Sequence, residues 1–389
     1  MRVPENIETP AVVVDAGRLE RNLDQMAAAA AAAGVALRPH AKTHKCAEIA
    51  RMQLARGAAG LTVATLAEAE AFAAAGCPSV FVAYPLWARA GDRPERIMAL
   101  RSATDLRIGV DSVPAAEALA AAAPGTRVLI EIDSGQHRTG VPPAEAGKLA
   151  AACQRLGLDV VGAFTHPGHS YGGVDAVGAA VADEESALAV AGEALAGVLD
   201  QAPELSGGSS PTAFAELAPG RPAPPAPPAV DPASTARPSG RGHMDGTFMG
   251  ENGLVLTEVR PGTYAFGDRQ QMRLSGLGDE DVALVVAARV VSVPRPGEAV
   301  LDAGSKALTS DRAGWLAGHG LILEAPEATI AWLSEEHAVV HGLRESSLAV
   351  GDLVRVVPNH VCPVVNLTGS LTVVRDGEIA DRWPVIARR

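Results

Sequence analysis

Short apolar runs alternate with longer alanine-rich segments along the first two thirds of the chain. The longer segments repeat apolar residues at helical spacing, as Leu19, Leu23 and Met26 do before Gly34 ends the pattern. The short runs contain few polar residues, so both faces of each predicted strand are expected to be buried, as in a parallel sheet. These strand predictions cover residues 11–15, 61–65, 79–85, 106–112, 127–133, 159–166 and 256–262.

Strands that alternate with helices in this way predict an α/β fold. About eight strand candidates favour a (β/α)8 barrel of the TIM type over residues 11–265, although a doubly wound sheet would produce the same local pattern. Over residues 266–389 the apolar runs follow one another with turn residues between them, which predicts a mainly antiparallel β domain. Residues 1–10 are expected to add an N-terminal strand to that domain.

One segment, residues 215–242, fits neither domain. It contains eight of the chain's 28 prolines and almost no large apolar residues. Such a composition buries too little surface to offset the entropy of ordering, so we predict a mobile insertion in a barrel loop. A lid over a binding site is the functional alternative.

Length, charge and cysteine content narrow the class of protein. The 389 residues exceed the roughly 250–300 at which single cores stop growing, which agrees with two domains. A net charge of −12 disfavours binding to nucleic acids and to anionic membranes. The four cysteines follow no disulfide or CxxC spacing, as expected in a reducing compartment. Neither a signal-peptide pattern nor an apolar run of roughly 18 residues is present, so we expect a soluble, cytoplasmic protein.

The string RPHAKTHK, residues 38–45, places two histidines and two lysines where the second barrel strand would end. In such barrels the carboxyl ends of the strands carry the active site. On a strand, His40, Lys42 and His44 would share one face, and Lys45 would point away. The clustered positive charge would favour a neutral Lys42 amine, the form that acts as a nucleophile or a base. An exposed basic loop is the competing interpretation of this string.

Four later strings also combine polar side chains with glycine at predicted strand ends. They are DSGQHRTG (133–140), THPGHSY (165–171), SGGSS (206–210) and RPGTYAFGD (260–268). Backbone amides of glycine and hydroxyl groups of serine or threonine are donors that hold phosphate groups, and the last barrel loops often form such a site. Each string alone is typical of an ordinary turn, but all of them together with an early lysine indicate a cofactor site.

Taken together, these strings resemble those of the fold-type III pyridoxal-phosphate enzymes, which include alanine racemase. The chain is most similar to the branch of D-serine dehydratases and D-threonine aldolases, over nearly its whole length apart from residues 215–242. The resemblance implies that Lys42 forms the Schiff base with pyridoxal 5'-phosphate, that Arg138 holds its phenolic oxygen, and that His166 lies against its pyridine ring. It also implies that Arg260 faces the ring nitrogen.

The same resemblance implies a phosphate site built from two loops. The residues assigned to it are Gly207, Gly208, Ser209, Gly262 and Thr263, with Ser210 in place of the threonine that is usual in this branch. Tyr171 and Tyr264 are further candidates for contact with the cofactor. His169, Lys306, Glu335 and Glu336 receive no chemical role.

In the string VVPNHVCPVV, residues 356–365, His360 and Cys362 stand two positions apart, so on a strand their side chains would face the same way. Imidazole and thiolate suit zinc better than magnesium or calcium, and two protein ligands leave positions open for water or substrate. A buried cysteine beside an unrelated histidine is the alternative from spacing alone. The resemblance favours a metal site: in this branch a final cysteine goes with zinc in the dehydratases, and a final aspartate with manganese in the aldolases.

The resemblance therefore implies a zinc-dependent D-serine dehydratase. Lys42 would remove the Cα proton, the metal would assist departure of the β-hydroxyl, and pyruvate and ammonia would result. The alternative is an aldolase with a divalent metal, Mn2+ included, that cleaves D-threonine or D-3-hydroxyaspartate. An amino-acid racemase would need a second base instead of a metal, and a non-catalytic pyridoxal-phosphate carrier would lack the β domain. We expect a D-amino acid substrate and a homodimer, without nucleic-acid or membrane partners.

Overall fold

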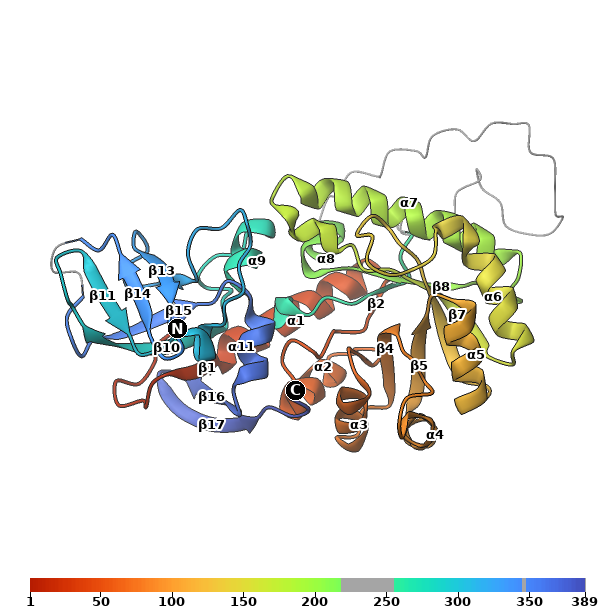
Figure 1. Ribbon diagram of the computed structural model, residues 1–389, viewed down its shortest axis with the longest axis horizontal. Coiled ribbons are helices and arrows are strands. Elements are labelled where there is room, and N and C mark those ends of the chain that lie inside the picture. Colours follow the sequence, from red (N-terminus) through yellow and green to blue (C-terminus); the bar gives the residue numbers. More distant parts are fainter. Residues whose placement is uncertain (218–254, 345–347, 389) are drawn as a thin grey trace.

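Two parts make up the molecule, a barrel surrounded by helices and a β domain beside it, as Figure 1 shows for the computed structural model. The structure describes residues 1–217, 255–344 and 348–388. The proline-rich segment lies outside the described residues from residue 218 onward, so neither the insertion nor the lid predicted there is tested.

The barrel is one sheet of eight parallel strands in the order β2–β9–β8–β7–β6–β5–β4–β3. The strands are β2 (Ala36–Leu37), β3 (Leu61–Val63), β4 (Ser79–Pro85), β5 (Asp105–Val110), β6 (Arg127–Glu131), β7 (Asp159–Phe164), β8 (Glu204–Gly207) and β9 (Glu258–Val259). The two edges of the sheet meet at a parallel bridge between His40 and Thr62, where Ala41 N donates to Thr62 O over 2.8 Å. The predicted (β/α)8 barrel is confirmed.

Helices precede and connect the barrel strands and cover the outer face of the sheet (Figure 1). They are α1 (Ala16–Ala32), α2 (Ala47–Ala55), α3 (Leu66–Ala74), α4 (Arg93–Ala103), α5 (Val113–Ala122), α6 (Ala146–Arg155), α7 (Ala176–Ala196) and α8 (Ser210–Glu216), with the short 3-10 helices η1 (Pro143–Glu145), η2 (Gly168–Gly172) and η3 (Thr263–Ala265). Leu19, Leu23 and Met26 lie on the buried face of α1, as their spacing predicts, and Asp15 begins this helix by accepting a hydrogen bond from Arg18 N. Within the described ranges, no helix combines the length and the apolar character that crossing a membrane requires.

The β domain is built on a nine-stranded sheet in the order β13–β14–β11–β10–β1–β16–β17, in which β15 pairs with β10 and β12. Its strands are β1 (Ala11–Asp15), β10 (Leu284–Ser292), β11 (Glu298–Leu301), β12 (Leu321–Ile322), β13 (Thr329–Leu333), β14 (Ala338–His341), β15 (Leu353–Val357), β16 (Ser370–Arg375) and β17 (Glu378–Pro384), and its helices are α9 (Arg269–Leu274), α10 (Ser305–Leu308) and α11 (Val361–Leu367). The strands pair antiparallel, apart from β1 with β16. The predicted mainly antiparallel β domain is confirmed.

The first strand belongs to the β domain, so the prediction of a barrel strand at residues 11–15 is wrong. β1 lies between β10 and β16 in the nine-stranded sheet. As a central strand it is buried on both faces, with Val13 in one apolar cluster and Val12 and Val14 in another. A barrel strand is buried on both faces too, which is why an apolar run alone does not distinguish the two positions. The strand expected within residues 1–10 is not formed there.

A small apolar cluster fills the interior of the barrel. Phe81, Leu129 and Phe164 point to the face of the sheet opposite the helices and form a cluster separate from the main core. The rings of Phe81 and Phe164 meet edge to face, with their centroids 5.0 Å apart. The guanidinium carbon of Arg260 lies 5.6 and 5.2 Å from these two centroids. The cluster therefore forms a floor beneath the side chains that follow the barrel strands.

Replacement of Gly162 tests how closely β7 and β8 approach each other. A Cβ atom there would lie 1.9 Å from the carbonyl oxygen of Glu204, so Gly162→Ala must force the two strands apart. We expect this variant to lower the free energy of unfolding by more than about 2 kcal/mol. Gly178→Ala on α7 is the control, because nothing lies within 4 Å of a Cβ at that position and alanine stabilises a helix by about 0.5–1 kcal/mol. Urea unfolding measures both, and equal stability of the two variants would contradict the close contact.

Candidate active site

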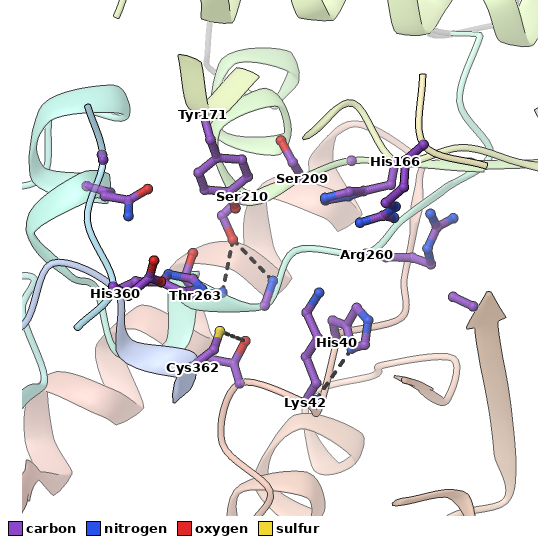
Figure 2. Close-up of a pocket in the computed structure, with 18 of the residues that line it drawn as sticks. His40, Lys42, His166, Tyr171, Ser209, Ser210, Arg260, Thr263, His360 and Cys362 are labelled. Carbon is purple, nitrogen blue, oxygen red and sulfur yellow. Dashed lines mark hydrogen bonds between the residues drawn. The ribbon is translucent and has the colours of Figure 1, made fainter. Parts of the chain in front are cut away.

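A cavity of about 350 Å³ opens at the carboxyl ends of the barrel strands, where the β domain meets the barrel (Figure 2). The barrel contributes to its wall His40, Lys42, Thr43, Ala83, Arg138, His166, Tyr171, Gly208, Ser209, Ser210, Arg260, Gly262 and Thr263. The β domain and the segment that leads to it contribute Gln270, Asp311, Arg312, Ala313, His360 and Cys362. The cavity is thus bounded by both parts of the molecule, and most of its charged side chains are basic.

Of the residues predicted to contact the cofactor or the metal, all but Gly207 and Tyr264 line this cavity. Gly207 packs against another buried side chain, since a Cβ there would lie 2.3 Å from Glu184 Oε1. The side chain of Tyr264 is 2% exposed, and its hydroxyl accepts a hydrogen bond from Gln53 Nε2 over 3.0 Å, away from the cavity. The assignments of Gly207 and Tyr264 are therefore corrected: both support the site from behind.

Lys42 faces the cavity from a turn and not from a strand. The strand geometry ends at His40, because Thr43 N donates to His40 O and His44 N donates to Ala41 O. The predicted alternation therefore fails at His44, which leaves the face shared by His40 and Lys42. Burial lowers the pKa of the Lys42 amine. The turn thus delivers a single amine of reduced basicity into the cavity.

Charged neighbours adjust that pKa in both directions. Cys362 and Glu68 raise the pKa of Lys42, whereas the positive charges of Arg138 and Arg260 lower it. Because burial exceeds each of these effects, the pKa remains below the ordinary value for a lysine. A larger share of Lys42 is therefore in the neutral amine form at physiological pH than for an ordinary lysine.

Lys45 points away from the cavity and joins the two domains. Its Nζ lies 3.1 Å from Glu68 Oε1 and donates to Asn366 Oδ1 over 2.7 Å. Asn366 belongs to α11, the helix that carries Cys362. The two lysines therefore have different tasks: Lys42 enters the cavity, and Lys45 holds a helix that forms part of its wall.

Beneath Lys42, a buried chain of hydrogen bonds links His44 to Tyr264. Cys46 N donates to His44 Nδ1 over 3.1 Å, so the other ring nitrogen, Nε2, carries the proton and donates to Gln53 Oε1 over 3.2 Å. Gln53 Nε2 then donates to the hydroxyl of Tyr264. Burial lowers the pKa of His44 to about 4, so this imidazole is neutral at physiological pH. The chain fixes the turn that presents Lys42.

His40 and His166 line the cavity as neutral imidazoles. Burial lowers the pKa of each well below its ordinary value, and the positive charge of Lys42 acts in the same direction. Lys42 N donates to His40 Nδ1 over 3.4 Å, which orients the ring of His40. The positive charge of the cavity therefore resides mainly on its arginines.

The loops after β8 and β9 present backbone amides to one side of the cavity. Gly262 N and Thr263 N donate to Ser210 Oγ over 3.1 and 3.0 Å, as the dashed lines in Figure 2 mark. Gly208 has a φ of 83°, a left-handed conformation that favours glycine. A Cβ at Gly262 would lie 2.5 Å from Thr43 Oγ1. Glycine is therefore favoured at both positions, and the Ser210 hydroxyl with the two amides that donate to it forms a cluster of donor groups on this side of the cavity.

Arg260 lies at the floor of the cavity. Its Nη1 donates to Ser206 Oγ and its Nη2 donates to Thr165 O. Burial lowers its pKa to about 10, while the carboxylates of Glu258 and Glu184 act in the opposite direction. Arg260 therefore stays protonated at neutral pH, in a position fixed by hydrogen bonds and by the rings below it.

His360 and Cys362 lie together on the wall that the β domain contributes. They do not lie on a strand, as predicted, because β15 ends at Val357 and His360 is the N-cap of α11. Burial alone would raise the pKa of the Cys362 thiol and lower the pKa of the His360 imidazole. Attraction between the Cys362 thiolate and the His360 imidazolium outweighs burial when it acts together with the hydrogen bonds to Asp268 and Thr43 and the positive charge of Lys42. The pKa of Cys362 is therefore lowered and that of His360 is raised. Thr43 Oγ1, from the turn after Lys42, lies 3.3 Å from Cys362 Sγ.

The donor set of this pair fits a zinc ion. In the part of the chain that the structure describes, no group of three or more His, Cys, Asp or Glu side chains is arranged to hold a metal ion. His360 and Cys362 would therefore be the two protein ligands, and water or substrate would complete the coordination. An open coordination sphere is typical of a reactive metal site, since structural zinc sites are closed by four protein ligands.

Residues 311–313 line the cavity without any pattern in the sequence that predicts it. They belong to a loop between α10 and β12 that hydrogen bonds anchor to other parts of the chain. Asn359 Nδ2 donates to Gly318 O over 2.9 Å, and Trp315 Nε1 donates to Tyr171 O over 2.8 Å. Thr43, Ala83 and Gln270 also line the cavity, and their only signal in the sequence is their position beside a predicted strand or string.

Two protein families match this chain. The family described as alanine racemase, N-terminal domain, matches residues 14–220, and the family described as putative serine dehydratase domain matches residues 283–374. The chain belongs to the fold-type III pyridoxal-phosphate enzymes. The family expected from the sequence strings is confirmed.

Relatives of this fold-type III enzyme over nearly its full length include dehydratases and aldolases. It is 33% identical to D-threo-3-hydroxyaspartate dehydratase of Delftia sp. (strain HT23), covering 92% of this chain and 91% of the relative. It is 32% identical to D-threonine aldolase of Arthrobacter sp, covering 98% of this chain and 93% of the relative. The solved structure of D-threonine aldolase from Filomicrobium marinum superimposes with a TM-score of 0.81 at 29% identity, covering 100% of this chain and 98% of that chain. The expected enzyme class, a pyridoxal-phosphate-dependent lyase, is confirmed.

The side chains that line the cavity of this fold-type III enzyme fit pyridoxal phosphate in their chemistry. An amine of lowered pKa at Lys42 suits an aldehyde, and the guanidinium of Arg138 suits a phenolate oxygen. The hydroxyl of Ser210, together with the amides of Gly262 and Thr263 that donate to it, is the kind of donor cluster that suits a phosphate group, and the close approach at Gly262 leaves no room for a side chain in its place.

Protonation of His44 should make the stability of the protein depend on pH. Above its ordinary pKa of 6.5 the imidazole is neutral in both the folded and the unfolded chain, and burial lowers the folded-state value to about 4. Between these values only the unfolded chain binds the proton, so the free energy of unfolding falls as the pH falls, by up to about 3 kcal/mol. His44→Gln removes this proton-binding site, and we expect a smaller fall over the same window. Chemical denaturation within and above the window measures both proteins; identical pH slopes would contradict the buried, neutral state of His44.

Proposed function

We propose that the chain is a pyridoxal-phosphate- and zinc-dependent dehydratase of D-3-hydroxy amino acids, of the D-serine dehydratase type, which releases a keto acid and ammonia. One observation carries the proposal: the Lys42 amine and the pair of His360 and Cys362 come from different domains and line one cavity. In Figure 2, Lys42 rises between Cys362 and His40. A base and a metal site in one cavity are what removal of a Cα proton and of a β-hydroxyl group requires.

The barrel residues would hold the cofactor. Bound pyridoxal phosphate supplies an electron sink for the charge that develops at Cα. We assign its attachment to Lys42, its phenolic oxygen to Arg138 and its ring face to His166. We assign its phosphate group to Gly208, Ser209, Ser210, Gly262 and Thr263, all of which line the cavity.

Lys42 is the group that we assign to proton removal at Cα. Its lowered pKa provides the neutral amine that can accept a proton at Nζ. Arg260 stays protonated, and a guanidinium that faces the ring nitrogen opposes protonation of that nitrogen. Because an unprotonated ring is a weaker electron sink, departure of the β-hydroxyl needs assistance.

We assign that assistance to a metal held by His360 and Cys362. Their donor types favour zinc, with Mn2+ as the alternative, and a bound metal supplies Lewis acidity at the β-hydroxyl. Two solved structures of D-threo-3-hydroxyaspartate dehydratase support the assignment. One carries alanine in place of a cysteine and is in the metal-free form, and the other carries alanine in place of a histidine two positions earlier.

An aldolase is the second candidate. The relative from Arthrobacter sp is a D-threonine aldolase and matches 98% of this chain. Retro-aldol cleavage would use the same metal position. The β-hydroxyl group would lose its proton and become the aldehyde oxygen, and the Cα–Cβ bond would break in place of the bond to the hydroxyl group. Cys362 favours the dehydratase, because the aldolases that this chain resembles end the metal string with aspartate. The expected homodimer and cytoplasmic location remain predictions.

An assay of the purified protein, loaded with pyridoxal phosphate and zinc, tests the proposed function. We expect keto acid and ammonia from D-serine, and loss of this product when a chelator removes the metal. Lys42→Met should reduce turnover by about 100-fold to 10,000-fold, because the base is lost. Lys148→Met is the control, since the Lys148 side chain is 83% exposed and lies outside the cavity.

Each other product assigns a different function. Formation of glycine and an aldehyde would identify an aldolase in place of a dehydratase. Interconversion of D- and L-amino acids that survives chelation would identify a racemase. Bound cofactor without any turnover would identify a non-catalytic pyridoxal-phosphate carrier.

The charge of the cavity wall bears on the choice of substrate. Arg312 is exposed, lines the cavity and lies on the anchored loop of the β domain. The Delftia relative acts on D-threo-3-hydroxyaspartate, a substrate with a second carboxylate. We propose that Arg312 pairs with such a carboxylate.

Replacement of Arg312 separates the two types of substrate. Arg312→Met should lower kcat/KM for D-threo-3-hydroxyaspartate by about 10-fold to 100-fold, which is what loss of a charge-assisted hydrogen bond costs. The kcat/KM for D-serine should change far less. Arg295→Met, whose side chain is 74% exposed and pairs with Glu298, is the control. Steady-state kinetics with both substrates measures the effect, and equal losses on the two would contradict the assignment.

A further inference from the structure

Asp268 lies between the N-termini of two helices in the wall of the cavity. It precedes α9, where its Oδ1 accepts a hydrogen bond from Gln271 N over 2.8 Å. Its Oδ2 accepts from Val361 N, the first residue of α11, over 3.1 Å. One carboxylate therefore satisfies backbone amides of two helices that are far apart in the sequence.

The same carboxylate contacts His360. Asp268 Oδ2 lies 3.3 Å from His360 Nδ1, and the Asp268 side chain is completely buried, while that of His360 is 25% exposed. His360 occupies the N-cap position of α11, but its own side chain makes no capping hydrogen bond. Because Asp268 supplies the acceptor for Val361 N, the imidazole of His360 is left to face the cavity.

Backbone hydrogen bonds hold this arrangement in register. Arg269 N donates to Pro358 O over 3.0 Å, and Gln270 N donates to Asn359 O over 3.3 Å. Arg269 Nη1 also donates to Asn359 Oδ1 over 3.2 Å. The residues that flank Asp268 are thus tied to the residues that precede His360, so the carboxylate and the imidazole have little freedom to separate.

We propose that Asp268 is a positioning residue of the metal site: it accepts a hydrogen bond from His360 Nδ1 and so leaves Nε2 as the nitrogen that binds the metal. This inference rests on the proposed function, because it requires His360 to be a metal ligand. A histidine ligand generally donates its other ring nitrogen to a carboxylate or carbonyl, and loss of that partner lowers metal affinity about 10-fold to 100-fold. Asp268 is not itself a third ligand, because within the described ranges no three such side chains are grouped around one point.

Asp268→Asn tests the proposal, with Asp15→Asn as the matched control. Asparagine has one acceptor oxygen in place of two, so it cannot accept from Gln271 N, Val361 N and His360 Nδ1 together. Where its NH2 group faces Nδ1, it favours the wrong tautomer of His360. Asp15 also caps a helix, by accepting from Arg18 N over 3.0 Å, and does not line the cavity. The control therefore reports the effect of replacing a capping carboxylate alone.

The measurement is zinc affinity, by competition with a chromophoric chelator, of protein that retains pyridoxal phosphate and has been stripped of metal. We expect Asp268→Asn to bind zinc about 10-fold to 100-fold more weakly than the unaltered protein, with cofactor absorbance unchanged. Asp15→Asn should bind zinc with unchanged affinity. Asp268→Glu, which keeps the carboxylate, should recover part of the lost zinc affinity. Two results would each overturn the proposal: a folded Asp268→Glu that recovers none of the affinity, or an Asp268→Asn with unchanged affinity.

His360→Ala separates failure of this inference from failure of the proposed function. Zinc binding that survives in His360→Ala would place the metal elsewhere and would overturn both. Loss of zinc in His360→Ala, with unchanged affinity in Asp268→Asn, would overturn the role of Asp268 alone. Heteronuclear NMR of the imidazole nitrogens in the zinc-loaded, unaltered protein decides the question even where a variant does not fold. Coordination of His360 through Nε2 with a protonated Nδ1 supports the proposal, and coordination through Nδ1 overturns it.

Discussion

The hydrogen bonds that close the barrel are the constraint on which the site depends. β2 and β3 form the two edges of the sheet, and they meet where His40 bridges Thr62 and Ala41 N donates to Thr62 O. Immediately after this contact the chain turns, which brings Lys42 into the cavity and takes His44 into the core below it. The amine is therefore positioned by the backbone of a closed sheet, and a group held by rigid elements keeps its geometry better than one on a free loop.

A cavity shared by two domains requires that the domains keep one arrangement. Three kinds of contact serve this purpose here. β1 of the β domain continues directly into α1 of the barrel, so the chain itself joins them. Lys45 donates to Asn366 on α11, and Trp315 Nε1 donates to the carbonyl oxygen of Tyr171. The proposed base on one domain and the candidate metal ligands on the other are thus held at a distance that neither domain determines alone.

Much of this architecture was predictable from sequence because barrel sites follow a simple rule. Arg138, His166 and Arg260 stand just after the carboxyl ends of parallel strands, and such ends meet at one side of a barrel. Predictions failed where the rule of alternation did not apply. His44 follows a turn, so its side chain leaves the face that a strand would give it. Tyr264 lies in the short helix η3, which rotates it into the core.

Other features could not be read from local patterns. The apolar run of β1 indicates burial on both faces. A strand of the barrel and a central strand of the nine-stranded sheet are both buried in this way, so the run does not distinguish them. Residues 311–313 lie on a loop whose course is set by Asn359 and Trp315, contacts that join distant parts of the chain. Asp268 ends the string RPGTYAFGD without a local sign of its second role, because its contact with Val361, 93 positions away, exists only in the folded β domain.

The place of β1 in the sheet has a consequence for the order in which the protein assembles. On the ribosome β1 is made first, but its neighbours β10 and β16 follow only after the whole barrel has been synthesised. Until then its apolar faces and both of its edges lack their native partners, which is the condition under which nascent chains associate wrongly. The barrel, with its lysine, is complete before the α11 pair emerges. The residue that we assign to the base is therefore synthesised before the pair that we assign to the metal.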